Sequence, residues 1–250
     1  MAKSCWIIGA SYGIGESLAY QYYNNGYDII LSARSKDKLI HLKKKIKQNN
    51  NPQKIIIADF DACCINNFQK SFDKINKEIK KIDIAIYAPA LYKPENIFSF
   101  DIKYSHQILS TNLGGCLNFL HIIVNHMKKK RSGHIAIIAS VAGYFGLPNS
   151  LTYGATKAAI INLGEGIYCQ LKEKNINLSI INPGFVNTRL TKKNKFYMPF
   201  IISTKEAAKV IYNGINNKKF EIHFPKKFTF IIKLLKLLPY KILFLIIKKL

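Results

Sequence analysis

Cys5-Trp6-Ile7-Ile8-Gly9-Ala10-Ser11-Tyr12-Gly13-Ile14-Gly15 is the stretch that decides the fold of this chain. Its apolar start predicts a buried strand, residues 16–23 predict a helix, and Asn24-Asn25-Gly26 predicts the end of that helix. In such a unit the glycines let the backbone approach a diphosphate, and the N–H groups of the helix N-terminus point at it. The spacing is Gly-x-x-x-Gly-x-Gly, not the commoner Gly-x-Gly-x-x-Gly. In this setting we favour a dinucleotide-binding turn over a turn of purely structural meaning.

Tyr153 and Lys157 form a second candidate site, because they stand four residues apart and Ser140 precedes them. On a helix, both side chains would share one face. A phenol is a poor acid or base near neutrality because its ordinary pKa is about 10, and a nearby ammonium lowers that pKa by favouring the phenolate. The tyrosine could then exchange a proton with a carbonyl or an alcohol. An isolated Tyr-x-x-x-Lys match is also typical of an ordinary helix face, so the pair gains its weight from the glycine-rich turn.

Strand and helix patterns alternate along the whole chain. Strands are expected near 4–9, 27–32, 54–58, 82–87, 133–139 and 177–181, with helical stretches between them. This alternation predicts an α/β fold, a single Rossmann-type domain with a doubly wound parallel sheet covered on both faces. Substrates then gather at the carboxyl ends of the strands. With 250 residues, 48% of them hydrophobic, the chain is long enough for one large core.

Together these features resemble the short-chain dehydrogenase/reductase family over roughly residues 4–225. The glycine-rich stretch is similar to the family's cofactor turn, which implies that Gly9, Ser11, Tyr12, Gly13, Ile14 and Gly15 bind the cofactor. Asn112, Ser140, Tyr153 and Lys157 match its catalytic tetrad. The stretch around Asn182 resembles the turn beside the nicotinamide, which adds Pro183, Gly184, Val186 and Thr188 to the implied cofactor contacts.

The resemblance implies carbonyl reduction by hydride transfer, or the reverse oxidation with the same groups. NADPH would deliver the hydride, and Tyr153 would donate a proton to the oxygen. Lys157 would lower the pKa of Tyr153 and hold the nicotinamide ribose, so Tyr153 and Lys157 also count as cofactor-binding residues. Ser140 would hydrogen-bond the carbonyl oxygen where negative charge develops, and Asn112 would order a water that resupplies the proton.

One turn departs from the family pattern. After the strand near 82–87 the family usually has Asn-Asn-Ala-Gly, whereas this chain has Tyr87-Ala88-Pro89-Ala90. Proline fixes φ and lacks an N–H donor, and alanine replaces a glycine that tolerates positive φ. In the family this turn lies near the adenosine of the cofactor. We expect a locally different turn that keeps Ala88 at the cofactor and leaves the tetrad intact.

The end of the second expected strand should choose between NADP and NAD. An acidic side chain there would bind the ribose 2′-hydroxyl of NAD and repel a 2′-phosphate. The strand ends instead in Ser32-Ala33-Arg34-Ser35, where Arg34 can pair with a phosphate and Ser35 can add a hydroxyl donor. We therefore predict NADP over NAD. Asp59 resembles the family's aspartate that contacts the adenine, and the alternative is that it caps the next helix.

Composition limits the partners and the location. The formal net charge is +24, but the lysines are spread along the chain and no nucleic-acid motif is present, so we expect a lysine-covered surface and no nucleic-acid partner. The five cysteines, at 5, 63, 64, 116 and 169, show no metal-ligand spacing, which predicts no metal site and thiols in a reducing cytosol. A first strand that begins by residue 4 leaves no room for a signal peptide. We expect a cytoplasmic protein.

The tail at 226–250 differs from the catalytic domain expected at 1–225. It contains seven lysines, no acidic residue and mostly large apolar residues. Lysines and Pro239 interrupt every window long enough for a spanning helix, so two short helices separated at Pro239 are expected. An apolar helix fringed by lysines suits the plane of an anionic membrane, as a peripheral association. The alternative is an element that packs on the core or on a dimer partner.

The segment from Thr188 to Ser203 stands where the family carries its substrate lid. It is basic at Lys192-Lys193-Asn194-Lys195 and strongly apolar at Phe196-Tyr197-Met198-Pro199-Phe200-Ile201-Ile202. This composition favours a lipophilic ketone: a fatty-acyl, sphingoid-like or sterol-like substrate. Small apolar patches also arise from oligomer contacts, and family members usually form dimers or tetramers.

Two functions of different classes follow. The leading one is an NADP-dependent carbonyl reductase of lipid metabolism that works at a membrane surface. The other is a catalytically silent protein that senses NADP(H) or scaffolds partners at a membrane. The complete Asn112, Ser140, Tyr153 and Lys157 set favours the enzyme, and the altered turn at Tyr87-Ala88-Pro89-Ala90 keeps the second reading open.

Overall fold

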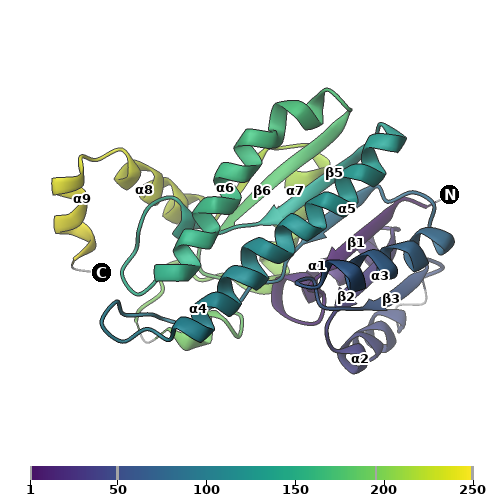
Figure 1. Ribbon diagram of the computed structural model, residues 1–250, viewed down its shortest axis with the longest axis horizontal. Coiled ribbons are helices and arrows are strands. Elements are labelled where there is room, and N and C mark those ends of the chain that lie inside the picture. The colour runs from purple at the N-terminus through teal and green to yellow at the C-terminus, as the bar shows by residue number, and fades with distance from the viewer. Residues whose placement is uncertain (1, 49–50, 195, 249–250) are drawn as a thin grey trace.

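The computed structural model describes residues 2–48, 51–194 and 196–248. Its centre is a seven-stranded, all-parallel sheet in the order β3-β2-β1-β4-β5-β6-β7 (Figure 1). The strands are β1 (Ser4–Ile8), β2 (Asp28–Ala33), β3 (Ile55–Asp59), β4 (Ile84–Tyr87), β5 (Gly133–Ile138), β6 (Ile176–Pro183) and β7 (Glu221–Phe224). The Rossmann-type, doubly wound sheet expected from the sequence is confirmed. The edge strand β7 is additional, because the sequence predicted six strands.

Helices cover both faces of the sheet (Figure 1). One face packs against α1 (Gly13–Asn24), α2 (Lys36–Lys47) and α7 (Thr204–Asn216), and the other against α3 (Ile65–Glu78), α5 (Gly115–Lys130) and α6 (Leu151–Lys172). The two cores follow from the alternation of side chains along a strand. In β1, Cys5 and Ile7 enter the first core, whereas Trp6 and Ile8 enter the second. Burial on both faces explains the continuous apolar run that opens the chain.

The loops that follow β1, β4, β5 and β6 meet at one edge of the sheet. Ile8 pairs with Ser32 of β2 and with Tyr87 of β4, and Tyr87 in turn pairs with Ile137 of β5. The turn after β1 is tied to the same edge, since Gly9 and Ala10 both donate their N–H groups to the carbonyl of Ser32. This edge brings together segments that lie far apart in the sequence, as a parallel sheet requires.

One helical run, Ile102–Lys130, is long and apolar enough to cross a membrane by length and composition alone. It comprises α4 (Ile102–Leu109), the π-helical turn η1 (Ser110–Gly114) and α5. Its most apolar window is 44% buried in the structure, and Phe119 and Ile123 of α5 belong to the second core. A core helix that packs on a sheet meets the same test, so we assign it to the fold.

The tail has two helices, α8 (Lys226–Lys236) and α9 (Tyr240–Ile247), and Pro239 stands immediately before α9. In Figure 1 they extend from the end of the molecule farthest from β3. Lys233 does not belong to a free cationic fringe, since it forms an ion pair with Glu221 of β7. Thr229 and Ile232 of α8 are buried, so this helix also packs on the domain. The end of the expected tail, 249–250, lies outside the described residues.

Candidate active site

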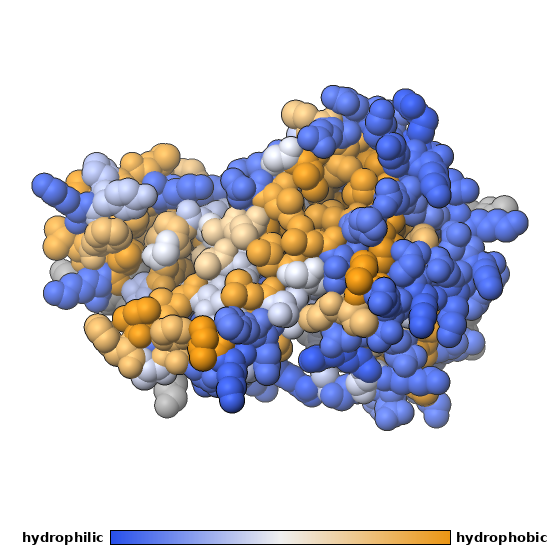
Figure 2. Space-filling model, in the orientation of Figure 1, coloured by the Kyte–Doolittle hydropathy of each residue, from blue (hydrophilic) through white to orange (hydrophobic). Residues whose placement is uncertain are grey.

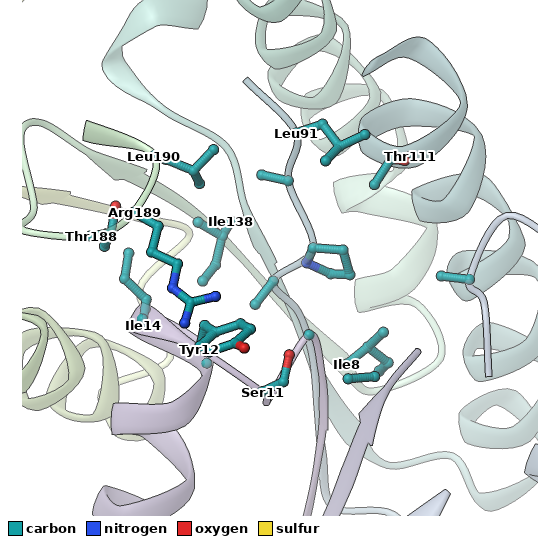
Figure 3. A pocket seen from close by; sticks show the side chains of 18 of the residues that line it. Ile8, Ser11, Tyr12, Ile14, Leu91, Thr111, Ile138, Thr188, Arg189 and Leu190 are labelled. Carbon is teal, nitrogen blue, oxygen red and sulfur yellow. The ribbon is translucent and has the colours of Figure 1, made fainter. Parts of the chain in front are cut away.

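A cleft of about 430 Å³ opens at the carboxyl edge of the sheet (Figure 3). It is lined by segments from β1, β2, β4, β5, α6 and β6, which the sequence separates by more than a hundred residues. Most residues predicted for the cofactor and the chemistry line it: Gly9, Ser11, Tyr12, Gly13, Ile14, Gly15, Arg34, Ser35, Ala88, Ser140, Tyr153, Lys157, Pro183, Gly184, Val186 and Thr188. Two predicted residues, Asn112 and Asp59, are not among the lining residues.

The glycine-rich turn has no room for side chains at two positions. Gly9 has φ +82°, and a Cβ there would lie 2.8 Å from the nitrogen of Pro89. A Cβ on Gly15 would lie 2.2 Å from the carbonyl oxygen of Gly9. Both contacts are with backbone, which cannot move aside cheaply. Glycine is therefore required because the turn folds tightly onto the start of α1 and onto the segment after β4.

The N-terminus of α1 fits a dinucleotide diphosphate. Tyr12 is the N-cap residue, its backbone is extended, and its side chain does not cap the helix. The first N–H groups of a helix lack internal partners and favour an anion. Here they open into the cleft together with Ser11 and Gly13. The residues present thus match the cofactor that the sequence predicts.

The turn that departs from the family pattern still forms part of the cleft wall. Ala88 donates its N–H to the carbonyl of Ile8 at 3.0 Å, and Ala88, Pro89, Ala90 and Leu91 all line the cleft. The Tyr87 side chain is buried, and its hydroxyl donates to the carbonyl of Thr111 at 2.6 Å. The turn is therefore held in place by its packing against Gly9 and by the hydrogen bond from Tyr87 to Thr111.

Asn112 acts on this turn from behind the cleft. It is fully buried within η1, where its amide oxygen accepts from the N–H of Leu91 at 2.7 Å. Its amide nitrogen donates to the carbonyl of Leu91 at 3.0 Å and to the Thr156 hydroxyl at 3.1 Å. The side chain thus fixes the segment after β4 to the helix that bears Tyr153. The role in ordering a water stays a prediction beside this positioning contact.

Tyr153 and Ser140 lie together at the cleft. The two side chains are hydrogen-bonded, and Ser140 also accepts the N–H of Ala142 at the start of η2 (Val141–Gly143). Burial raises the pKa of Tyr153 to about 12, and the bond from Ser140 works against that rise. The lowered pKa expected from the sequence is not found in the protein alone, since burial disfavours the phenolate.

The position of Lys157 explains why its ammonium does not lower the pKa of Tyr153. Its side chain is 1% exposed, and its Nζ donates to the carbonyl of Ile138 at 2.8 Å. The Nζ lies 5.5 Å from the centre of the Tyr153 ring. Burial lowers the pKa of Lys157 to about 8. The lysine is thus held at the floor of the cleft by β5, within reach of a group bound beside Tyr153.

The far end of the cleft is basic. Arg34 and Ser35 line it as predicted, and so does Lys38 in the first turn of α2, which the sequence analysis did not single out. Ser35 is the N-cap residue of α2, yet its hydroxyl does not cap the helix and is available to a ligand. Asp59 ends β3 with an exposed side chain, and the carboxylate that lines the cleft is Asp61. The predicted contact of Asp59 with the adenine stays a prediction, and the structure places Asp59 outside the cleft lining.

Arg189 is a cleft residue that the sequence analysis missed. Its guanidinium lies 3.4 Å from the centre of the Tyr12 ring, on the stretch between β6 and the short helix η3 (Thr191–Lys193), and Figure 3 shows it extending over that ring. The Nζ of Lys38 lies 4.6 Å from the same ring centre. The pKa of Tyr12 is lowered mainly by a hydrogen bond with Lys38, and Arg189 lowers it further. Within the described residues neither cation forms an ion pair with a carboxylate. Arginine is rare in this chain, and that rarity was the available signal.

The lid closes the other end of the cleft through Tyr92. The Tyr92 ring packs edge to face on Tyr153 at a centroid distance of 5.0 Å. Its hydroxyl donates to the amide oxygen of Asn194 at 2.7 Å, and its carbonyl accepts from the Nζ of Lys193 at 2.6 Å. The lid and the loop after β4 are therefore joined directly above the candidate general acid. Lys195, part of the predicted basic run, lies outside the described residues.

Glu95 is a second residue that sequence reasoning missed. It is 3% exposed, and it accepts from the Ser105 hydroxyl at 2.5 Å and from the Thr152 N–H at 3.0 Å. Thr152 belongs to the first turn of α6, next to Tyr153. A carboxylate at a helix N-terminus satisfies free N–H groups and interacts favourably with the helix dipole. Glu95 therefore fixes the start of the catalytic helix, although nothing local in the sequence indicated it.

Known proteins resemble this chain over most of its length. A family model described as short chain dehydrogenase matches residues 3–196. An uncharacterized oxidoreductase of Mycobacterium tuberculosis is 29% identical over 189 residues, 75% of each chain. A protein of Arabidopsis thaliana named 11-beta-hydroxysteroid dehydrogenase-like 3 is 29% identical and aligns with 92% of this chain and 76% of its own.

Solved structures share the fold. A short chain dehydrogenase/reductase from Burkholderia phymatum in complex with NAD superposes with a TM-score of 0.85 at 17% identity, covering 93% of this chain and 92% of that one. ElxO with NADP bound superposes with a TM-score of 0.78 at 23% identity, covering 89% of this chain and 98% of that one. The two neighbours hold different dinucleotides, so the likeness to them does not choose between NAD and NADP.

Proposed function

The chain belongs to the short-chain dehydrogenase family and is an NAD(P)-dependent oxidoreductase acting on an alcohol–carbonyl pair, and from this premise we propose that it reduces a lipophilic ketone with NADPH, using Tyr153 as the general acid. One observation carries the proposal. Tyr153, Ser140 and Lys157 line the same cleft as the glycine-rich turn, so a bound dinucleotide and a carbonyl substrate would meet beside the phenol.

The cofactor, when bound, supplies the hydride. Ser140 and Tyr153 both present hydroxyl groups to the cleft and together bind the carbonyl oxygen as it gains negative charge. Tyr153 then gives its proton to that oxygen. The raised pKa of Tyr153 keeps the phenol protonated at neutral pH, which suits a proton donor in the direction of reduction.

Lys157 is the cation closest to this chemistry. It is held by the carbonyl of Ile138, and its position lets it hold the ribose beside the nicotinamide and stabilise the phenolate that proton donation leaves on Tyr153. Asn112 acts as a positioning residue, because it ties Leu91 to Thr156 and so sets the cleft wall opposite Tyr153.

The NADP preference is supported by the charge at the far end of the cleft. Arg34, Ser35 and Lys38 line that end, and no carboxylate of the described part of the chain pairs with Arg34 or Lys38. Asp61 lines the cleft nearby, but its Oδ1 accepts the N–H of Cys63. A 2′-phosphate would meet two cations and a hydroxyl there.

The lipophilic substrate is supported by the lid. Tyr92 lies edge to face on Tyr153, and Leu91 and Leu190 line the substrate side of the cleft (Figure 3). We extend the proposal to a cytoplasmic protein associated peripherally with a membrane through 226–248, because the exposed residues of α8 and α9 are apolar and lysine.

Self-association is the remaining part of the proposal. Figure 2 shows an apolar area over α5 and α6, on the face turned toward the viewer. Leu117 of α5 is half exposed, and Ala155 and Ala158 of α6 are exposed. Small residues on one helix allow close approach of a second copy, so a homo-oligomer through α5 and α6 fits this face.

Oxidation of NADPH and of NADH, followed at 340 nm with short and long-chain ketones, tests the reaction. We expect NADPH turnover with a long-chain ketone, and a Tyr153→Phe variant that loses about a thousandfold in kcat while it still binds NADPH. Phenylalanine keeps the ring that packs on Tyr92, so a loss of rate is a loss of the proton donor.

A silent NADP(H) sensor is the second candidate, and the proline turn after β4 is the observation that favours it. Pro89 packs closely against Gly9, in a turn whose residues differ from the family pattern. Tight NADPH binding with no turnover of any ketone, unchanged in Tyr153→Phe, would establish the sensor and remove the reductase.

A further inference from the structure

Large apolar side chains that are exposed in the described part of the chain gather in three segments: 97–102, 196–201 and 230–246. The others, Ile40, Ile65, Leu109, Leu117 and Val210, are single residues on five different helices. Figure 2 shows apolar atoms on the end of the molecule formed by α8, α9 and the loop before α4. Apolar exposure on this scale marks a site of interaction. We call these three segments the apolar end.

The first segment presents an aromatic tip. Asn96 accepts the N–H of Phe98 through its side chain and the N–H of Ser99 through its carbonyl, which forms a tight turn. Phe98 at the tip of this turn is 94% exposed. The turn is anchored behind by Glu95, which is buried against α4 and α6. A rigid turn that holds a large aromatic side chain in solvent indicates that another apolar surface covers this side chain.

The second segment is the lid, and it is joined to both neighbours. Lys193 and Asn194 bond Tyr92, which precedes the aromatic tip in the sequence. On the other side the Phe196 ring lies 5.9 Å from that of Phe185, which lies 5.3 Å from that of Phe228 in α8. Tyr197 of the lid is 87% exposed. The three segments are thus one connected surface.

The third segment is anchored by its polar groups and exposes its apolar ones. Glu221 of β7 binds Lys233 of α8 and accepts from the hydroxyl of Tyr144 and the amide of Asn182. Beyond this anchor, Leu237 is 79% and Tyr240 is 75% exposed. The arrangement is the reverse of a helix that uses its apolar face to pack on its own domain.

The charges of the apolar end favour an anionic surface. Lys192, Lys227, Lys236, Lys241 and Lys248 are exposed around it. Its acidic residues are occupied: Glu95 is buried, Asp101 caps α4 by accepting from Lys103 and Tyr104, and Glu221 is paired with Lys233. Exposed apolar side chains within a ring of unpaired lysines match the interface of a bilayer that contains acidic lipids.

The catalytic cleft borders this surface, because residues that line the cleft lead into two of its three segments. Leu91 lines the cleft and the aromatic tip follows it, while Leu190 and Lys193 line the cleft and the apolar lid follows them. We propose that the whole apolar end docks on an anionic membrane with the cleft mouth facing the bilayer, so that the ketone enters from the lipid phase and not from water. This rests on the proposed reductase and extends its membrane contact from the tail to the lid and the loop before α4.

A bilayer fits this end better than a second copy of the chain. Two lysine-ringed ends would repel one another across an interface, whereas acidic headgroups neutralise them. The apolar area over α5 and α6 is not part of the apolar end and offers a separate surface for self-association. Self-association through the apolar end is therefore an outcome against the proposal.

The docking depth is measurable because the chain has a single tryptophan. Trp6 is fully buried in the core, so its emission gives a constant background. In a Phe98→Trp variant we expect quenching by vesicles that contain acidic lipids with brominated acyl chains. Vesicles of neutral lipid alone, with the same brominated chains, should not quench it. An Ile65→Trp variant places the reporter at the start of α3, outside the apolar end, and should not be quenched. Equal quenching of the two variants, or none at position 98, overturns the proposal.

Entry from the bilayer has its own readout. Anionic vesicles should raise kcat/KM for a long-chain ketone by about tenfold and leave that for a short, water-soluble ketone unchanged. In the double variant Phe98→Asp, Leu237→Asp this gain should disappear while the short ketone is still reduced at the wild-type rate, because both residues lie outside the cleft. Bilayer entry is contradicted if the double variant keeps the vesicle-dependent gain in kcat/KM. It is also contradicted if the gain in the wild type depends on protein concentration, as self-association would require.

The two proposals fail separately. Quenching at position 98 without turnover of any ketone would keep the membrane surface and remove the reductase. Tyr153-dependent reduction of soluble ketones without quenching would keep the reductase and remove the membrane surface. Thermal unfolding of each variant confirms that the exposed substitutions leave the fold intact.

Discussion

The cofactor side of the cleft and the apolar end are held together in opposite ways. On the cofactor side, backbone contacts backbone: Gly15 and Gly9 touch, and buried polar groups such as Lys157 and Asn112 have fixed partners. At the apolar end, single side-chain contacts such as Lys233 with Glu221 hold elements whose other side chains face outward. The family match ends at residue 196, before most of the apolar end.

This difference predicts where substitutions are costly. A close backbone contact or a buried charge cannot relax, so a change there alters folding and cofactor binding together. An exposed side chain can be replaced with little loss of stability, so a change at the apolar end should alter only what the protein touches. The following variants test whether the two regions separate in this way.

Lys157 should give the largest effect, through the pH dependence of stability. Its pKa is about 8 in the folded protein against an ordinary 10.5, so between these values the unfolded chain binds more protons and the free energy of unfolding rises with pH. We expect a rise on the order of 3 kcal/mol across the full window in the wild type and none from this source in Lys157→Met. Urea unfolding from pH 7.5 to below 10 measures it as the difference between the wild type and Lys157→Met, because the raised pKa values of Cys5, Cys116 and Tyr153 add an opposite slope to both profiles.

Lys172→Met is the matched control, because Lys172 lies on the same helix and is exposed. Its pH profile should parallel that of the wild type. If Lys157→Met also parallels the wild type, the ammonium is not held away from water as the contact with Ile138 indicates.

Gly15→Ala should have the second-largest effect, on both the stability and the cofactor affinity of the cofactor side. Its Cβ would meet the carbonyl oxygen of Gly9 at 2.2 Å, so the turn must open. We expect a loss of about 2 kcal/mol in the free energy of unfolding and at least about a tenfold loss in NADPH affinity. Gly166→Ala in α6 is the control, since nothing lies within 4 Å of its Cβ, and it should stabilise the helix slightly. Similar binding by both variants would mean that the turn is wider than this contact allows.

Arg189 and Arg34 should separate the two phosphate regions of the cofactor. Arg189 stacks over Tyr12 at the glycine turn, so Arg189→Met should weaken NADPH and NADH alike, by about tenfold. Arg34 lies at the end of β2, so Arg34→Met should weaken NADPH and leave NADH unchanged. Nucleotide fluorescence titration measures both without turnover. Arg131→Met, at the end of α5, is the control for the loss of an arginine. A selective loss of NADPH in Arg189→Met would move this residue to the 2′-phosphate.

Much of the cofactor side was predictable because its requirements are local. A strand, three glycines at fixed spacing and a helix start are enough to specify the turn, and the four-residue spacing of Tyr153 and Lys157 puts both on one helix. Arg34 was found because it follows the second strand directly. Asp59 does not line the cleft because it ends β3 with an exposed side chain, whereas Asp61 stands beyond the strand, where the chain turns along the cleft.

The rest depends on contacts between distant residues, which the sequence does not encode locally. Glu95 is buried only because α6 begins beside it, and Arg189 becomes a cleft residue only by stacking on Tyr12. The strand β7 is short and polar enough, as Glu-Ile-His-Phe, to give no clear pattern. For the same reason the sequence counted Lys233 among the lysines that fringe the tail, although Glu221, twelve residues earlier, binds it.

Glu221 gives the smallest and most local test of the apolar end. Burial alone would raise its pKa, but hydrogen bonds from Lys233, Tyr144 and Asn182 outweigh it, so the pKa is lowered and the carboxylate stays charged at neutral pH. Glu221→Gln keeps the shape and removes the charge, so we expect a loss of at most about 1 kcal/mol in the free energy of unfolding, with faster hydrogen exchange confined to α8 and α9. Because Phe228 of α8 lies against Gly184 beside the cleft, a loosened tail should also lower kcat for the long-chain ketone, while the affinity for NADPH stays unchanged. Glu206→Gln on α7 is the control, since within the described part of the chain this exposed carboxylate bonds Ser203 alone. Faster exchange throughout the sheet in Glu221→Gln would show that α8 is part of the core and not the support of a separate docking surface.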